Sequence, residues 1–286
     1  MIELTLILTD TKMKKLFLIV CLCTVWGLRA QQPLTEEMYL HEDSILWISY
    51  EARMNELYGL MQQAPEKKDS LMLVADKELN EVLEKNRMLA IRYASVPSGL
   101  QRVYMTRLDM PKDTLVRVLA SLPAEMQDSF YGRCIRGHIE TDQIEEGDPV
   151  VEFPCVTIDG SEFDWSVAEG KQLLMLYSGL SCMGEWGRQQ LKEIYEQTSR
   201  DDLLVFVYWP CESLEALQQA REQYEFECDN YYFVSDFKGD ATPMKIKYGT
   251  QATPTCFLTD RDHTVKVKCI GLDVDRMEPY LARTKK

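Results

Sequence analysis

The chain has 286 residues, of which 45% are hydrophobic, and a formal net charge of −14 at pH 7. Nucleic acids and anionic membrane surfaces are negatively charged, so an acidic chain without a run of basic residues argues against nucleic-acid binding and strong membrane binding. At about 150 residues per domain, the length predicts two domains.

Residues 1–30 contain the pattern of a secretory signal peptide. Lys14 and Lys15 form its basic region, residues 16–26 form its apolar core, and the tripeptide 28–30 is a cleavage site. The apolar core is too short to span a bilayer, which requires about 20 apolar residues. The pattern therefore predicts an exported protein rather than one held by a membrane-spanning helix.

Two details of this segment concern the start of the exported chain. Residues 1–12 displace the basic region from the terminus, so we expect translation to start at Met13. Cleavage near Ala30 would release residues 31–286 into the periplasm or cell envelope. A lipoprotein attached through Cys21 or Cys23 is the weaker alternative, because neither cysteine directly follows the small residue that such a site usually requires.

The first domain, residues 31–144, is predicted to be all-helical. Apolar residues recur there at helical spacing, and Pro111 and Pro123 stand where helices should begin. We expect helices near 35–63, 67–94, 98–109, 112–122 and 124–142. Their Met, Tyr and Leu stripes indicate core packing rather than ligand contacts.

The pattern changes at residues 145–149, where strands begin to alternate with helices. A hairpin is expected over 153–165 around the turn Asp159-Gly160. Further strands are expected at 172–178, 203–209, 231–235, 255–260 and 264–270, and helices at 183–199, 212–226, 239–248 and 273–284. This order predicts an α/β domain over 145–286, a mixed sheet covered by helices on both faces.

Cys182 stands between the predicted strand 172–178 and the predicted helix 183–199. A cysteine at a helix N-terminus has a lowered pKa, because the helix dipole favours the thiolate. A redox-active pair would place a second cysteine three residues later, but that position is Glu185. The segment thus combines the setting of a reactive thiol with only half of a Cys-x-x-Cys motif.

Four segments together resemble the envelope thioredoxin-like proteins of the TlpA-like and AhpC/TSA-like type. They are 147–153, the turn 159–160, the run into Cys182, and Ala252-Thr253-Pro254-Thr255-Cys256. The resemblance covers residues 145–286, and the helical half is similar to N-terminal domains often fused to such proteins. It implies a thioredoxin-like fold, a cis peptide bond between Thr253 and Pro254, and Cys182 as the attacking thiol.

The chain departs from that family at two positions. Family members that exchange disulfides carry a second cysteine where Glu185 stands, and commonly a basic residue where Trp186 stands. The second cysteine resolves the mixed disulfide by attacking the first sulfur. Glu185 is expected to accept from free amides of the first helical turn, and its charge would oppose thiolate formation at Cys182.

Seven cysteines remain after the predicted cleavage, an odd number. Cys211 follows the strand expected beside 172–178 and is the first candidate for a substitute resolving thiol; Cys256 is the second. Cys134, Cys155, Cys228 and Cys269 are expected to be structural thiols or to form a structural disulfide. No Cys-x-x-Cys follows Ala30 and the chain has three histidines, so neither a metal nor a cofactor is predicted.

Three functions remain open. The first is a thiol-disulfide oxidoreductase with an atypical single-cysteine site, whose partners are protein thiols or disulfides of the cell envelope. The second is a catalytically degenerate module that binds partners through the surface around Pro254. A thiol peroxidase fits less well, because such sites usually carry threonine three residues before the cysteine, where this chain has Gly179.

Overall fold

The computed structural model describes residues 33–224 and 231–282. The predicted signal peptide and Cys228 lie outside the described residues. The contacts between residues of the chain divide it into two compact units, Met1–Leu89 and Ala90–Lys286. The expected domain boundary at 144/145 falls inside the second unit, because Tyr104, Arg107 and Tyr131 of the predicted helices hydrogen-bond to the segment 240–251 before the last two strands.

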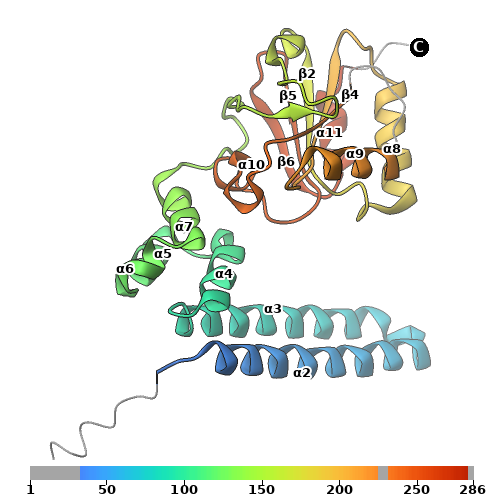
Figure 1. The fold of residues 1–286 in the computed structure, drawn as a ribbon. Helices are drawn as coiled ribbons and strands as arrows, with labels where there is room; N and C mark the ends of the chain where they lie inside the picture. Colours follow the sequence, from blue (N-terminus) through green and yellow to red (C-terminus); the bar gives the residue numbers. More distant parts are fainter. Residues whose placement is uncertain (1–32, 225–230, 283–286) are drawn as a thin grey trace, which may run out of the picture. The chain divides into compact units, whose positions relative to one another are not determined.

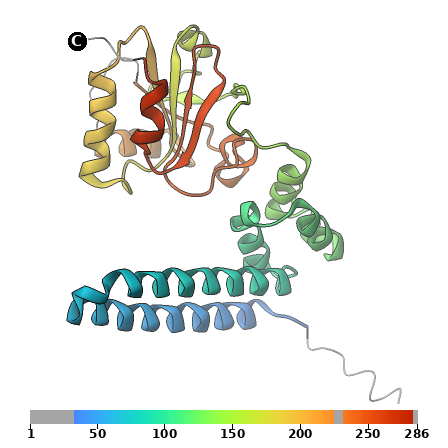
Figure 2. The same cartoon turned by 180° about the vertical axis from the view of Figure 1, so that it is seen from behind.

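The described part of the first unit is a helical hairpin (Figure 2). Helix α2 spans Glu36–Gln63, the 3₁₀ helix η1 spans Pro65–Lys67, and α3 spans Lys68–Arg92. Thr35 caps α2 by accepting a hydrogen bond from the amide of Met38 at 3.2 Å. Met54, Leu57, Met61 and Ala75 form the buried core between the helices. The two predicted helices are present.

Four short helices open the second unit. They are α4 (Pro97–Met105), α5 (Lys112–Ser121), α6 (Ala124–Gln127) and α7 (Phe130–Glu140), with the 3₁₀ helix η2 (Arg107–Asp109) after α4. The prediction of one helix over 124–142 is wrong. Ser129 interrupts it and caps α7, because its hydroxyl accepts from the amide of Gly132 at 3.2 Å.

A six-stranded mixed sheet follows, in the order β1-β4-β3-β2-β5-β6 (Figure 1). Strands β2, β3 and β4 are parallel, and β1, β5 and β6 pair antiparallel with their neighbours. The strands span Val156–Thr157 (β1), Gln172–Tyr177 (β2), Leu203–Tyr208 (β3), Tyr231–Ser235 (β4), Thr255–Thr259 (β5) and Val265–Ile270 (β6).

Helices cover both faces of the sheet. Helices α8 (Gly184–Glu196), α9 (Leu214–Gln223) and α11 (Val274–Met277) pack on the face that carries Leu174 and Val205. The 3₁₀ helix η3 (Trp165–Ala168) and α10 (Pro243–Ile246) pack on the opposite face. The predicted fold class is confirmed: an α/β, thioredoxin-like mixed sheet, preceded by helices.

The predicted hairpin over 153–165 is present around its turn, where the amides of Thr157 and Phe163 donate to the carbonyls of Ser161 and Cys155 at 2.9 Å and 2.8 Å, but its second arm is not a regular strand. Only Val156–Thr157 forms a strand, and it pairs with β4; a single bridge joins Val156 to Glu162. Trp165 starts η3 instead, and its indole nitrogen donates to the carbonyl of Phe153 at 3.0 Å. Aromatic packing of Trp165 on Phe153 and Phe206 thus ends the arm beyond the paired residues.

Two predicted helices are also shorter than expected. The region 239–248 divides into a 3₁₀ helix, η4 (Gly239–Ala241), and α10, because Pro243 starts a new helix capped by Thr242. At the C-terminus, α11 ends at Met277 and a 3₁₀ helix, η5 (Glu278–Tyr280), continues in place of the helix expected over 273–284.

Arg107 joins the helical part of the second unit to the segment before β5. Its side chain is 0% exposed. One guanidinium nitrogen donates to the carbonyl of Tyr104 at 3.0 Å and to Oε1 of Gln251 at 2.7 Å. The other donates to the carbonyls of Lys245 at 2.7 Å and Thr250 at 3.1 Å. Burial lowers the pKa of Arg107, so these four bonds must compensate for lost hydration.

Replacement of Arg107 tests this connection. We expect Arg107→Ala to lower the free energy of unfolding by about 2–4 kcal/mol, because it leaves buried carbonyls without donors. Arg117→Ala is the control, since Arg117 is exposed in α5 and should change stability by no more than about 0.5 kcal/mol. Denaturant unfolding followed by circular dichroism measures both; equal stabilities would contradict the assignment.

Candidate functional site

A tight turn carries Cys182 from β2 to α8. Ser178 and Gly179 both have positive φ angles, 53° and 91°. The amides of Cys182 and Met183 donate to the carbonyl of Gly179 at 3.0 Å and 2.9 Å. The helix begins two residues after Cys182, at Gly184. The turn thus holds the thiol directly before the helix N-terminus, where a thiolate is favoured.

The thiol of Cys182 is exposed and lies beside two hydroxyl groups. Its Sγ atom is 3.5 Å from Oγ1 of Thr253 and 3.7 Å from Oγ of Ser181. These hydrogen bonds, that of Thr253 above all, hold the pKa of Cys182 below its ordinary value. Exposure and a lowered pKa are the two properties that a nucleophilic cysteine needs.

The loop before β5 contacts the turn that carries Cys182. The peptide bond between Thr253 and Pro254 is cis, and Pro254 is buried. A Cβ atom placed on Gly179 would lie 2.4 Å from Cβ of Pro254, closer than any real contact. Only glycine therefore fits at this point, and the close packing sets Thr253 beside Cys182.

Glu185 and Trp186 lie in the first turn of α8, and both are exposed. The side chain of Trp186 is 73% exposed, an unusual fraction for an indole. Since it stands four residues after Cys182, it adds apolar surface close to the thiol. Such surface is typical of a region that contacts another molecule.

The two candidate resolving cysteines lie in different environments. Cys211 is half-buried after β3; its thiol donates to the carbonyl of Ser213 at 3.5 Å, and burial raises its pKa. Cys256 is 0% exposed within β5, and burial raises its pKa far more. Both thiols are free, so the structure does not pair either of them with Cys182.

The remaining described cysteines are also free and buried: Cys134, Cys155 and Cys269. Burial raises the pKa of Cys134 to about 11 and that of Cys155 to about 12. Cys269 lies opposite Cys256 in the β5–β6 pairing. Cys182 is thus the one exposed thiol among the described cysteines. Within the same residues, no cluster of His, Cys, Asp and Glu could hold a metal ion.

Three residues around the site escaped sequence analysis. Ser181 adjoins the cysteine, and its hydroxyl was recognisable only once the turn placed it beside the sulfur. Gly179 was considered as the place of a missing threonine, while its positive φ angle and its contact with Pro254 are tertiary features. Arg107 belongs to a helical segment without any motif, 144 residues before its partner Gln251.

No family model and no curated protein matches the chain. Solved structures resemble its sheet-containing part. A thiol peroxidase from Chromobacterium violaceum is 18% identical with a TM-score of 0.40, covering 49% of this chain and 87% of that chain. A thiol-disulfide oxidoreductase from Bacteroides fragilis NCTC 9343 is 15% identical with a TM-score of 0.40, covering 48% and 97%. At this level of similarity, the matches assign no activity.

A third solved structure has a similar level of likeness and likewise assigns no activity. It is a thiol-disulfide isomerase from Corynebacterium glutamicum, 15% identical with a TM-score of 0.40, covering 48% of this chain and 98% of that chain. Separately, no helix within 33–224 or 231–282 is both long and apolar enough to cross a membrane.

The pH dependence of alkylation tests the hydroxyl contacts. We expect Cys182 to react with iodoacetamide at a lower pH than an ordinary cysteine does, because its pKa is lowered. Thr253→Val removes the main hydrogen bond, so the midpoint of the pH–rate curve should move up. Thr114→Val, in α5, is the control and should leave the midpoint unchanged. Mass spectrometry of the peptide that contains Cys182 gives the rates, and superimposable curves would contradict the contact.

Alanine variants of two glycines separate the effect of the Gly179–Pro254 contact from the effect of backbone strain. Gly179 and Gly147 have similar φ angles, 91° and 97°, but a Cβ atom on Gly147 would meet nothing within 4 Å. Both alanine variants therefore carry backbone strain, and only Gly179→Ala also forces Pro254 to move. We expect Gly179→Ala to cost about 1–3 kcal/mol more in unfolding free energy. Equal losses in thermal unfolding experiments would show that Gly179 and Pro254 are not in close contact.

Proposed function

We propose that this chain is an exported thiol–disulfide exchange protein that uses Cys182 as its single reacting thiol. One observation carries the proposal: an exposed thiol with a lowered pKa lies between a helix N-terminus and the loop of Thr253 and Pro254. Thiolate is the attacking species in disulfide exchange, so a lowered thiol pKa favours that reaction.

The reaction begins when the Cys182 thiolate attacks one sulfur of a substrate disulfide. The substrate S–S bond breaks, a mixed disulfide forms with Cys182, and the second substrate sulfur leaves as a thiolate. Because Glu185 cannot resolve this intermediate, another thiolate of the substrate attacks the same substrate sulfur. That step forms a new substrate disulfide and restores the Cys182 thiolate. No electrons are gained or lost, so a single-thiol site supports isomerisation better than net reduction.

Cys211 offers a different second step. Its attack on Cys182 would release a reduced substrate and leave a Cys182–Cys211 disulfide, which an external thiol would then have to reduce. A half-buried thiol with a raised pKa is a poor nucleophile, so this route requires a local shift of the chain after β3. If it operates, Cys211→Ser should accumulate mixed disulfides with substrate proteins.

The partners that we propose are proteins of the cell envelope that carry thiols or disulfides. The exposed indole of Trp186 supports a polypeptide substrate, because it places apolar surface next to the reacting sulfur. The predicted signal peptide supports the location. A module that binds partners at this surface without turnover is the second candidate, and the glutamate at position 185 is the observation that favours it.

Activity measurements with two substrates separate these functions. We expect the wild-type protein to isomerise scrambled ribonuclease A, and Cys182→Ser to be inactive. Insulin reduction with dithiothreitol should be weak in the wild type and rise about tenfold or more in Glu185→Cys, which completes a dithiol. Glu193→Cys is the control, because it adds an exposed thiol to the same helix away from Cys182.

The possible results point to different conclusions. Isomerase activity that survives Cys182→Ser would refute the site. An inactive wild type that still binds unfolded ribonuclease A would support the binding module.

A further inference from the structure

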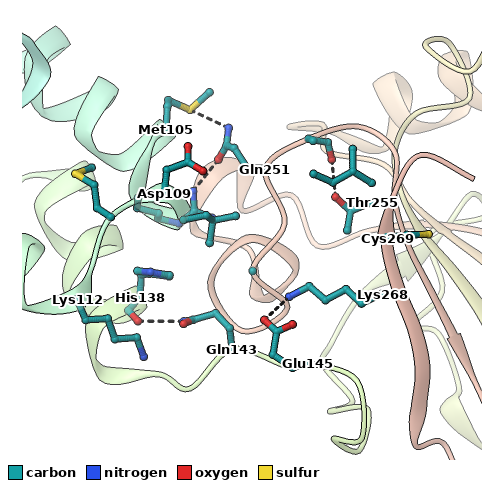
Figure 3. A pocket seen from close by; sticks show the side chains of 16 residues that line it. Met105, Asp109, Lys112, His138, Gln143, Glu145, Gln251, Thr255, Lys268 and Cys269 are labelled. Atoms are coloured by element: carbon teal, nitrogen blue, oxygen red, sulfur yellow. Dashed lines mark hydrogen bonds and ion pairs between the residues drawn. The ribbon is translucent and has the colours of Figure 1, made fainter. Parts of the chain in front are cut away.

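A pocket of about 680 Å³ lies within the second unit, away from the thiol of Cys182. Its walls are η2 and the start of α5, the last turn of α7, the loop around Gln251, and the ends of β5 and β6 that face them (Figure 3). This volume is typical of small-molecule sites. The residues that line it have no role in the exchange chemistry proposed above.

The charge of the lining is opposite to that of the chain. Three cations, Arg107, Lys112 and Lys268, line the pocket against two carboxylates, Asp109 and Glu145, while the whole chain carries −14. A local excess of positive charge on an acidic protein is typical of a site that attracts an anion.

The ammonium groups of Lys112 and Lys268 each have two partners within the protein. The Nζ atom of Lys112 lies 2.7 Å from the carbonyl of Thr141 and 3.5 Å from a carboxylate oxygen of Asp142. Nζ of Lys268 donates to the carbonyl of Ile144 and to Glu145, both at 2.8 Å. Since an ammonium group has three N–H donors, each lysine retains one for a ligand.

His138 adds a neutral polar group beside the cations. Its side chain is 3% exposed, and burial, together with the charges of Arg107 and Lys112, lowers its pKa to about 4. Its Nδ1 atom is buried and has no hydrogen-bond partner among the described residues. His138 thus brings a ring nitrogen with unused hydrogen-bonding capacity to the pocket lining, and a neutral imidazole can donate one hydrogen bond to a ligand.

We propose that this pocket binds a small organic carboxylate, held between Lys112 and His138 with its apolar body against Met105, Met110 and Ile270. Figure 3 shows Lys112 and His138 on the helical wall of the pocket, and Lys268 on the facing sheet wall. The ligand group is an acceptor because the available atoms are N–H donors. The body is apolar because thioether and aliphatic side chains form much of the remaining wall.

Binding at this site is independent of the exchange reaction. Gln251 and Ala252 line the pocket directly before Thr253 and Pro254, yet Cys182 does not contribute to it. Cys182→Ser should therefore bind the same carboxylate with unchanged affinity. This variant distinguishes a failure of the pocket proposal from a failure of the proposed function.

Calorimetric titration of the full chain tests the ligand class. The probe is 4-phenylbutyrate, and 4-phenylbutan-1-ol is the neutral comparison with the same apolar body. We expect a dissociation constant of about 1 mM or lower for the carboxylate, and binding weaker by about tenfold or more for the alcohol. Added sodium chloride should weaken only the carboxylate. Equal affinities, or no binding of the carboxylate, would overturn the proposal without any variant.

Two lysine variants then locate the site. Lys112→Met should weaken 4-phenylbutyrate binding by about tenfold, because it removes a charged donor while keeping an unbranched side chain. Lys192→Met is the control, since Lys192 is an exposed lysine of α8 paired with Glu196 at 3.7 Å. Thermal unfolding confirms that both variants are folded. Equal binding by the two folded variants would place the carboxylate elsewhere and refute the assignment.

Discussion

The buried guanidinium of Arg107 is the interaction on which the geometry of the second unit depends. A charged group at 0% exposure must find acceptors for its N–H donors, and it finds four, two of them backbone carbonyls between residues 245 and 250. That segment leads into the cis bond before Pro254, and Pro254 packs on Gly179. A residue of the helical part thus takes part in holding the loop that stands beside Cys182.

The pKa of Cys182 is set by hydroxyl groups beside the sulfur, which also lies before the N-terminus of α8. Hydrogen bonds from Thr253 and Ser181 stabilise the thiolate and lower the pKa of Cys182 without adding net charge. A lowered pKa raises the fraction of thiolate, while the nucleophilicity of each thiolate falls as its pKa falls. This balance suits a cysteine that must both attack a disulfide and be released again.

The sequence predicted the sheet well and the surroundings of the site poorly, for a physical reason. Strands such as Leu203–Tyr208 are continuous apolar runs, because both of their faces are buried, and such runs are visible locally. The second arm of the expected hairpin pairs only through residues 161–163, because Trp165 packs on other aromatic rings and starts a 3₁₀ helix. The position of Cys182 before a helix could be predicted from the sequence, because the apolar strand and the amphipathic helix around it are local patterns. Its contact with Thr253 spans 71 residues and required the folded chain.

Burial of the other described cysteines has a consequence for the oxidation of the chain. Cys134, Cys155, Cys256 and Cys269 have raised pKa values and almost no solvent-accessible surface, so at neutral pH they are protonated and out of reach of oxidants. The folded structure therefore protects these four thiols from oxidation. Unfolding would remove that protection from four sulfurs at once, so loss of the native state and irreversible cross-linking are expected to occur together in this chain.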